Sequence, residues 1–156
     1  MKTYFFCLMF SLGLSQGVLA QNQQQVADID KAKQEIDNNV GNFHKIDEFK
    51  DSNGYTYVYK NDKELTLITL YRKDQNIDKH VEWYFMDGKM IYAEQTWADN
   101  KTSKLIDNER LYFSSGHLIN LISNGKTVDT DSKKFSDADN AVAANRAWLE
   151  TKYASK

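Results

Sequence analysis

The sequence contains no proline and only one cysteine, Cys7. Without proline, the chain has none of the extended proline-rich linkers that often separate domains. Cys7 lies in an apolar stretch near the N-terminus, and the rest of the chain has no thiol. A disulfide, a thiolate nucleophile and a cysteine-ligated metal are therefore excluded for that remainder.

Residues 1–20 have the pattern of a secretory signal peptide. Lys2 precedes an uncharged, mostly apolar run from Tyr4 to Leu14, and Val18-Leu19-Ala20 ends in the kind of small residue that signal peptidase favours. The apolar run is too short to span a bilayer. We therefore expect cleavage after Ala20 and export of a 136-residue product, without a membrane anchor, to the periplasm or the extracellular space. The short charged start and the lack of further cysteine are typical of a bacterial protein.

Charge of neither sign dominates the chain. It has 20 Lys and Arg against 22 Asp and Glu, a net charge of −2 that becomes −3 without the leader, and the two signs are interspersed. Nucleic acids and anionic membranes both require a positive surface, so neither is predicted as a partner. The length after cleavage fits one domain over residues 21–156.

The first element expected after the leader is an amphipathic helix. Its apolar residues recur at intervals that keep one stripe of a helix facing inward. Gly41 provides a stop. The stripe consists of Val26, Ile29, Ile36, Val40 and Phe43.

From Tyr55 the hydrophobic period changes to two, which predicts an antiparallel meander of about five or six strands. Asp87-Gly88 is the strongest hairpin signal, because its turn type requires positive φ angles. In the strand Glu64–Lys73 the apolar residues change phase, so either both faces are covered or a bulge lies there. The other expected strands are Tyr55–Lys60, Val81–Met86, Lys89–Trp97, Arg110–Phe113, His117–Ile122 and a short edge strand Lys126–Asp129, with polar loops at Asp74–Lys79 and Asn100–Asn108.

A second helix is expected at the C-terminus. Ser136-Asp137-Ala138-Asp139 resembles a capping box and would open a helix that runs to about Lys152. Trp148 would anchor it to the sheet. The fold predicted is therefore α+β, with both helices on the same face of the sheet. The inward stripe would be Ala141, Ala144 and Trp148, widened by Val142, Leu149 and Tyr153.

Two of the expected hairpins repeat each other. Tyr84-Phe85-Met86-Asp87-Gly88-Lys89-Met90-Ile91 aligns with Tyr112-Phe113-Ser114-Ser115-Gly116-His117-Leu118-Ile119, and Val58 to Leu65 forms a fainter third copy. The pattern resembles the hairpin repeats of bacterial MORN-type and antitoxin-like proteins, although the second glycine of each MORN unit is missing. The resemblance implies a binding or scaffold meander without an active site.

The order of elements, a helix followed by an antiparallel meander, is similar to that of cystatin-like folds. The Q-x-V-x-G hairpin of cystatin-type protease inhibitors does not occur here. The similarity therefore concerns topology and implies no transfer of activity.

Few residues suggest catalysis or cofactor binding. His44, His80 and His117 lack the spacing of a zinc site, so no metal and no cofactor is predicted. Glu82 and Glu94 alternate with apolar residues in strands. If Glu82 pointed into a concave apolar face, its pKa would rise and it could act as a base in a small enzyme or ligand carrier. The alternative is that Glu82 faces water while the neighbouring Val81, Trp83 and Phe85 face a helix.

The aromatic residues of the strands form the main candidate for a functional surface. Tyrosine and tryptophan commonly anchor contacts with proteins and carbohydrates. Alternatively, these rings only cover the second face of the sheet. We predict an exported, non-enzymatic binding module that engages a protein or a glycan through an aromatic sheet face or through hairpin tips, for example an inhibitor or immunity-type protein. The candidate binding residues are Tyr55, Tyr57, Tyr59, Trp83, Tyr84, Tyr92, Trp97 and Tyr112.

Overall fold

The computed structural model describes the backbone of residues 8–154, and the side chains of this range except those of residues 8–20, Asp47, Ala144 and Ala154. The start of the predicted signal peptide, residues 1–7, and residues 155–156 lie outside the described part. Among the described residues, no helix is long and apolar enough to cross a membrane.

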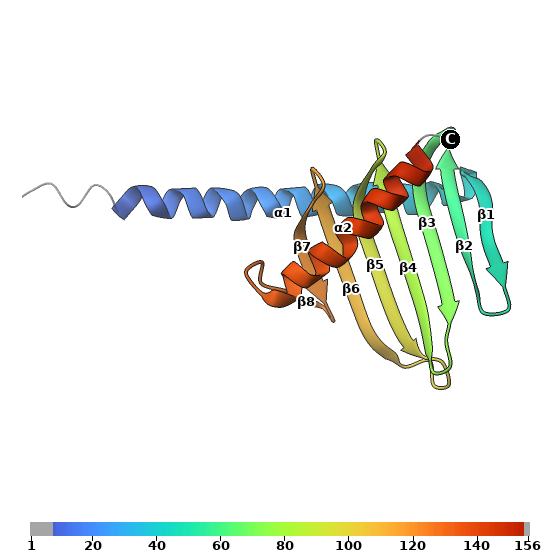
Figure 1. The fold of residues 1–156 in the computed structure, drawn as a ribbon. Coiled ribbons are helices and arrows are strands. Elements are labelled where there is room, and N and C mark those ends of the chain that lie inside the picture. Colours follow the sequence, from blue (N-terminus) through green and yellow to red (C-terminus); the bar gives the residue numbers. More distant parts are fainter. Residues whose placement is uncertain (1–7, 155–156) are drawn as a thin grey trace, which may run out of the picture.

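The described chain forms an α+β fold in which a single antiparallel sheet lies between two helices (Figure 1). The sheet has eight strands in the order in which they occur in the chain. Each strand therefore pairs with its sequence neighbour, as predicted for a meander. The elements are α1 (Leu8–Asn39), the 3-10 turn η1 (Val40–Asn42), β1 (His44–Asp51), β2 (Gly54–Asn61), β3 (Glu64–Lys73), β4 (Ile77–Met86), β5 (Lys89–Asp99), β6 (Leu105–Ser114), β7 (His117–Ser123), β8 (Lys126–Thr127) and α2 (Lys133–Ala154).

The sheet has more strands than the predicted five or six, and several strands are longer. The strand β1 lies in a charged segment that showed no alternation, and it pairs only with β2 at the edge of the sheet. The strands β4 and β6 begin at Ile77 and Leu105, inside segments predicted to be loops. These segments are polar because they extend beyond the two helices. Ladder hydrogen bonds rather than apolar burial hold them in the sheet.

A bulge follows the turn in each of the three hairpins β2–β3, β4–β5 and β6–β7, and the first bulge explains the change of phase in β3. The pairing shifts between Tyr59 and Lys60 in β2, between Tyr84 and Phe85 in β4, and between Tyr112 and Phe113 in β6. In β3, Lys60 pairs with Leu65 and Tyr59 with Leu67, so Thr66 is the extra residue. Both alternatives left open for β3 are therefore present, a bulge and two covered faces.

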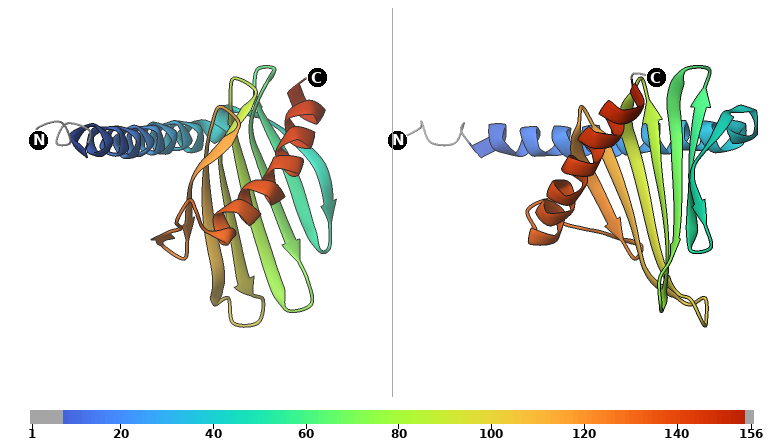
Figure 2. Two further views of the ribbon diagram at one scale, coloured as in Figure 1. Left: turned by 60° about the vertical axis from the view of Figure 1, so that its left-hand side comes forward. Right: turned by 45° about the vertical axis from the view of Figure 1, so that its right-hand side comes forward.

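The two helices lie on opposite faces of the sheet, so the predicted placement on one face is wrong (Figure 2). The helix α1 packs through Ile29, Val26 and Ile36 on a cluster that contains Tyr84, Tyr92 and Tyr112. The helix α2 packs on a separate cluster that contains Ile68, Ala93, Leu111 and Leu121. Neighbouring strand residues point to opposite faces. The aromatic pairs Tyr84-Phe85 and Tyr112-Phe113 therefore supply one ring to each cluster.

The helix α2 begins earlier than predicted and buries a different stripe. The hydroxyl of Ser132 accepts a hydrogen bond from the N–H of Phe135 at 3.2 Å and caps the helix, in place of the predicted Ser136. Trp148 is 58% exposed, with the ammonium of Lys152 4.8 Å from its ring centroid, so it does not anchor the helix. Ala141 is also exposed, and the side chain of Ala144 lies outside the described residues. The stripe that packs on the sheet is Phe135, Ala138, Val142, Leu149 and Tyr153.

The position of this stripe predicts unequal effects of two adjacent substitutions. Leu149 is 5% exposed, so Leu149→Ala should leave a cavity and lower the free energy of unfolding by about 2–5 kcal/mol. Trp148→Ala should lower it by about 1 kcal/mol or less, since the ring faces solvent. Urea denaturation followed by circular dichroism measures both. A larger loss for Trp148→Ala than for Leu149→Ala would contradict the packing described here.

Candidate functional site

The predicted binding residues lie in different environments. Tyr84, Tyr92 and Tyr112 are each 1% exposed and lie beneath α1. These three tyrosines are therefore not part of an exposed binding surface. For them the alternative prediction holds, in which the rings only cover the second face of the sheet. Tyr59 packs partly against the same cluster. Tyr55 and Tyr57 remain partly exposed on that side of the sheet, whereas Trp83 and Trp97 lie on the side of α2.

The three buried tyrosines form a row that ties α1 to the sheet. They are direct neighbours in the pairing register and meet edge to face, with ring centroids 5.5 Å and 5.1 Å apart. The hydroxyl of Tyr84 donates to Asp37 of α1 at 2.8 Å and also lies 3.0 Å from a carboxylate oxygen of Glu82. The hydroxyl of Tyr92 donates to Glu94 at 3.0 Å. The row is thus satisfied internally and is structural.

Burial also changes the acidity of this row. Desolvation is the largest cause that raises the pKa of Tyr84, Tyr92 and Tyr112, and neighbouring carboxylates raise each pKa further. The pKa of Tyr112 rises to about 12, chiefly through desolvation, and Asp30 of α1 is the carboxylate that raises it most. A hydroxyl that remains protonated can keep donating its hydrogen bond, so the contacts with α1 should survive well above neutral pH.

An alkaline titration tests this prediction. In the unfolded chain all tyrosines should ionise near pH 10. In the folded protein Tyr112 should remain protonated to about pH 12, so the rise in absorbance at 295 nm should lag behind that of the unfolded chain. Because the folded pKa lies above the unfolded pKa, the stabilisation is complete below pH 10 and declines between about pH 10 and 12. Tyr112→Phe should weaken this dependence of stability on pH. Coincident titration curves for the folded and unfolded protein would contradict it.

The half of the sheet that α1 leaves uncovered presents a second group of side chains on the same face. In Figures 1 and 2, α1 crosses the sheet near the β2–β3, β4–β5 and β6–β7 turns, which we call the hairpin tips, and the opposite ends of the strands extend past it. Two rows of cross-strand neighbours follow the buried tyrosines in this direction, and we call them the open strip. They are Tyr57, Thr69, Glu82, Glu94 and Arg110, and then Tyr55, Tyr71, His80, Thr96 and Asn108.

Three tyrosines at one end of the open strip are stacked on one another. The rings of Tyr55 and Tyr57 lie 4.3 Å apart at an angle of 14°, and the ring of Tyr71 lies 5.5 Å from that of Tyr55. The ammonium of Lys45 lies 3.4 Å from the centroid of Tyr57. Neighbouring side chains therefore cover both faces of the Tyr55 and Tyr57 rings, so only the edges and hydroxyls of these rings can contact a partner. Tyr71 is not among the candidate binding residues predicted from the sequence, because only the pairing with β2 places it beside Tyr55.

The middle of the open strip is polar and carries both signs of charge. Glu82 and Glu94 are directly opposite each other on β4 and β5. The amide nitrogen of Asn108 donates to Glu94 at 3.1 Å, and a ring nitrogen of His80 lies 3.9 Å from Glu82. The side chain of Glu82 is 25% exposed and lies beside α1. Glu82 therefore neither enters an apolar hollow nor stands wholly in water, whereas the neighbouring Phe85 packs on the α2 side as expected.

Two polar atoms near the open strip have no partner within the described residues. Oδ1 of Asp78 and Nε of Arg110 are buried without a hydrogen bond. Their strands alternate so that both side chains belong to the face of the open strip. Buried polar atoms are nearly always hydrogen-bonded in proteins, so each of these is a position where water or a partner can supply the missing bond.

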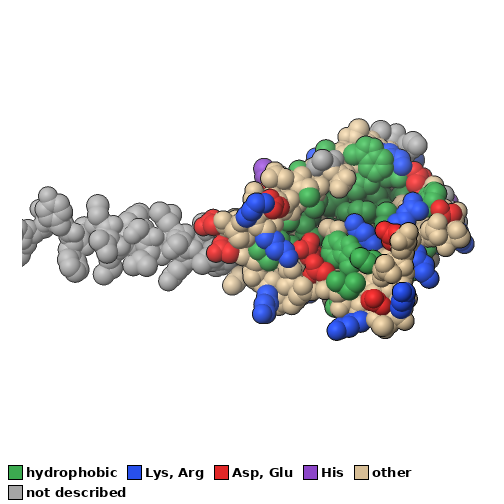
Figure 3. Space-filling model, turned by 60° about the horizontal axis from the view of Figure 1, so that its bottom comes forward, with side chains coloured by type: hydrophobic (Ala, Val, Ile, Leu, Met, Phe, Trp, Pro, Cys, Tyr) green, Lys and Arg blue, Asp and Glu red, His purple; other side chains and the backbone are tan. Residues whose placement is uncertain are grey.

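The face of the sheet on the side of α2 carries both apolar and polar side chains. Leu70 and Val81 are cross-strand neighbours there, Trp83 and Trp97 lie on the same side, and Lys79, Gln95 and Glu109 belong to the same rows. Figure 3, which views the end of the sheet at the β3–β4 and β5–β6 turns, shows hydrophobic side chains gathered in a hollow. The structure does not bring this hollow together with Glu82 and Glu94, because both carboxylates lie on the face of α1. Glu82 and Glu94 therefore do not place a carboxylate inside an apolar hollow, as the enzyme or carrier hypothesis requires.

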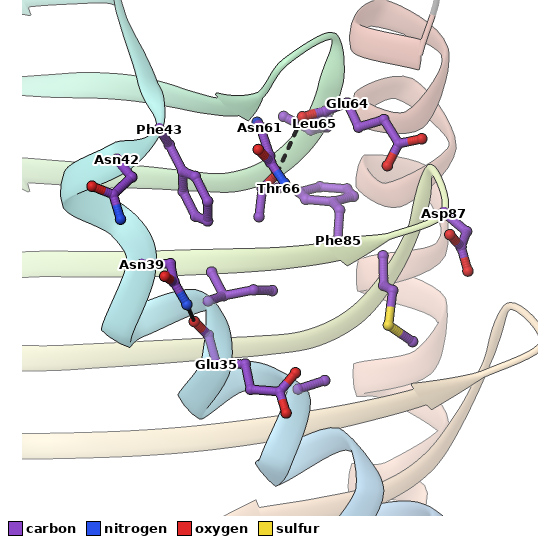
Figure 4. A pocket seen from close by; sticks show the side chains of 13 residues that line it. Glu35, Asn39, Asn42, Phe43, Asn61, Glu64, Leu65, Thr66, Phe85 and Asp87 are labelled. Carbon is purple, nitrogen blue, oxygen red and sulfur yellow. Dashed lines mark hydrogen bonds between the residues drawn. The ribbon is translucent and has the colours of Figure 1, made fainter.

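Small cavities lie between neighbouring hairpin tips, at the end of the sheet that both helices cover. Pairing between β3 and β4 stops at Leu67 and Tyr84, and beyond this row the two hairpins separate. The gap is a cavity of about 360 Å³ lined by the end of α1, the tip of β2–β3 and the end of β4 (Figure 4). Figure 4 shows the rings of Phe43 and Phe85 with the carboxylates of Glu35, Glu64 and Asp87 around them. An equivalent gap between β5 and β6 has a volume of about 450 Å³.

The histidines are not assembled into a site. His44 lies in β1, His80 in β4 and His117 at the start of β7. Within the described residues, no group of three or more His, Cys, Asp or Glu side chains is arranged to hold a metal ion.

Comparisons with protein-family models, with curated proteins and with solved structures find no match to this chain. The resemblances to MORN-type repeats and to cystatin-like folds therefore remain predictions. The function of this protein is therefore inferred from the residues of the site itself.

Proposed function

We propose that this protein is an exported, non-enzymatic binding module that engages a protein partner through the open strip. The observation that carries the proposal is the stack of Tyr55, Tyr57 and Tyr71 on a sheet face that α1 leaves uncovered. Tyrosines that are held rigid by stacking lose little conformational entropy when a partner binds. The adjacent charged and amide side chains can provide specificity around them.

The geometry of the stack favours a protein over a glycan. A sugar ring generally packs against a free aromatic face, but Lys45, Tyr55 and Tyr71 occupy the ring faces in this stack. The hydroxyls of Tyr55 and Tyr57 are left, and they can exchange hydrogen bonds with the main chain and side chains of a protein, whereas the hydroxyl of Tyr71 is hydrogen-bonded to Asp78. Glu82 and Arg110 add both signs of charge, which suits a mixed protein surface.

The contacts of α1 support the proposal of export. The described side chains of α1 that pack on the sheet begin at Val26 and end at Ile36, all beyond the predicted cleavage point after Ala20. In Figure 1 the N-terminal part of α1 extends away from the sheet. Cleavage there would leave these contacts intact. An inhibitor or immunity-type protein of a bacterial periplasm is one form that such a module could take.

The alternative of a small enzyme or carrier has less support. Its hollow is present on the α2 side, as Figure 3 shows, but Glu82 and Glu94 lie on the other face of the sheet. Substitutions in the open strip would not affect a carrier that used only this hollow.

A capture experiment tests the proposed surface. The protein is immobilised and exposed to a native envelope fraction or culture fluid, and the affinity of any captured protein is then measured in purified form. The combined change Tyr55→Ser, Tyr57→Ser and Tyr71→Ser should weaken binding by about tenfold or more, because anchor residues dominate interface energies. Trp148→Ser, an exposed ring on the opposite side of the molecule, is the matched control and should bind normally.

A milder set of variants separates the possible partners. Tyr55→Phe with Tyr57→Phe preserves the stack and removes two hydroxyls, each of which should contribute about 0.5–1.5 kcal/mol to a protein contact. Retention of full affinity by both the Phe and the Ser variants would overturn the proposed surface. Capture of a polysaccharide in place of a protein would show that the partner class is wrong.

A further inference from the structure

The larger of the two cavities between hairpin tips has the size of a ligand site. Pairing between β5 and β6 stops at Tyr92 and Tyr112, so the tips of β4–β5 and β6–β7 separate beyond that row. The gap, of about 450 Å³, is bounded by α1 on one side and α2 on the other. Pockets of about 300–1,000 Å³ are typical of small-molecule sites. This cavity lies at the end of the sheet opposite to the open strip, so it is independent of the proposed function.

The inner wall of the cavity is apolar. Met90 and Phe113 are 2% and 1% exposed, and Ile29 and Ile91 are 8% exposed. These side chains come from α1, β5 and β6, whereas α2 contributes the charged residues Arg146 and Glu150. A hydrocarbon chain of a ligand would find a preformed surface here.

Arg146 of α2 brings a positive charge to this apolar wall. Its side chain is only 17% exposed, and its guanidinium lies 6.0 Å from the ring centroid of Phe113. Within the described residues, Nη1 of Arg146 is buried and has no hydrogen-bond partner. A buried donor on a charged group that lacks a partner is costly, and a bound anion would relieve this cost.

The nearby acid Glu150 forms a long ion pair with this arginine and no hydrogen bond. Its Oε1 atom lies 4.0 Å from Nε of Arg146, beyond hydrogen-bond distance, and accepts the N–H of Met90 at 3.1 Å. Its other oxygen lies 3.9 Å from the ammonium of Lys89 at the cavity rim. Glu150 is thus engaged with the β4–β5 hairpin and leaves the guanidinium of Arg146, a lining residue of the cavity, without a hydrogen bond to this carboxylate.

We propose that this cavity binds a small monocarboxylate with an apolar tail, with Arg146 as the anchoring residue. Guanidinium and carboxylate groups form charge-assisted, often bidentate hydrogen bonds. The apolar wall accommodates the tail. Asp28 and Glu150 also line the cavity, and their charge disfavours ligands with several negative groups. A single carboxylate is therefore the chemistry that fits.

Titration of the ¹⁵N-labelled protein with octanoate tests the site, with octan-1-ol as the uncharged probe. Octanoate should cause saturable shifts of the amide signals of Met90, Ser115 and Gly116, at an affinity about tenfold higher than that of octan-1-ol. Arg146→Met keeps the aliphatic stem of the side chain and removes the charge, so it should lose this difference. Lys133→Met, an exposed lysine of the same helix, is the control and should bind as the unaltered protein does.

A second variant keeps the test decisive if Arg146→Met fails to fold. Glu150→Gln retains the acceptor for Met90 and removes a negative charge beside the ligand, so octanoate should bind about threefold to tenfold more tightly. Octanoate that binds no better than octan-1-ol, or binding that is unchanged in both variants, would overturn the proposal. Saturable shifts confined to the α2-side hollow would overturn it as well.

Discussion

The bulge that follows the turn in each of the hairpins β2–β3, β4–β5 and β6–β7 is the constraint on which the rest of this structure depends. A strand exposes alternate residues to opposite faces, and an extra residue changes that phase locally. In β5 the extra residue of the bulge is Ile91, so Met90 packs under α2 while Tyr92, two residues on, packs under α1. At Thr66 it switches Leu65 and Leu67 to different cores. Two helices can therefore clamp the same end of one sheet.

The same bulges place the cavities. Beyond Tyr84 and Tyr112 neighbouring hairpins no longer pair, so each tip separates from the next. Two carboxylates of α2 accept hydrogen bonds from backbone N–H groups near the tips. Asp139 accepts the N–H of Leu118, and Glu150 accepts the N–H of Met90. These are equivalent positions in the two repeated hairpins. The internal repeat thus has a structural meaning, since it gives α2 the same anchoring point on successive hairpins.

The clamp at one end leaves the two faces different at the other end. On the face of α1, the uncovered strands carry stacked tyrosines, two adjacent carboxylates and Arg110. On the face of α2 they carry Leu70, Val81 and the two tryptophans of β4 and β5, together with Lys79, Gln95 and Glu109. The open strip therefore differs from the opposite face by its stacked tyrosines beside paired polar side chains. This difference is the physical reason for assigning partner binding to the open strip.

The sequence by itself determined the α+β class, the order of elements, the Asp87-Gly88 turn and the repetition of the hairpins. These features depend on local periodicity and on residues that accept positive φ. It did not determine β1 or the polar starts of β4 and β6, because ladder hydrogen bonds leave no signature in side-chain type. Only the tertiary structure decided that the helices take opposite faces, that Tyr84, Tyr92 and Tyr112 are buried while Tyr55 and Tyr57 meet Tyr71 outside, and that Leu149 rather than Trp148 packs on the sheet. Each of these outcomes depends on which distant residues share a row or a face, and that is set by strand register and by the packing of helices on the sheet.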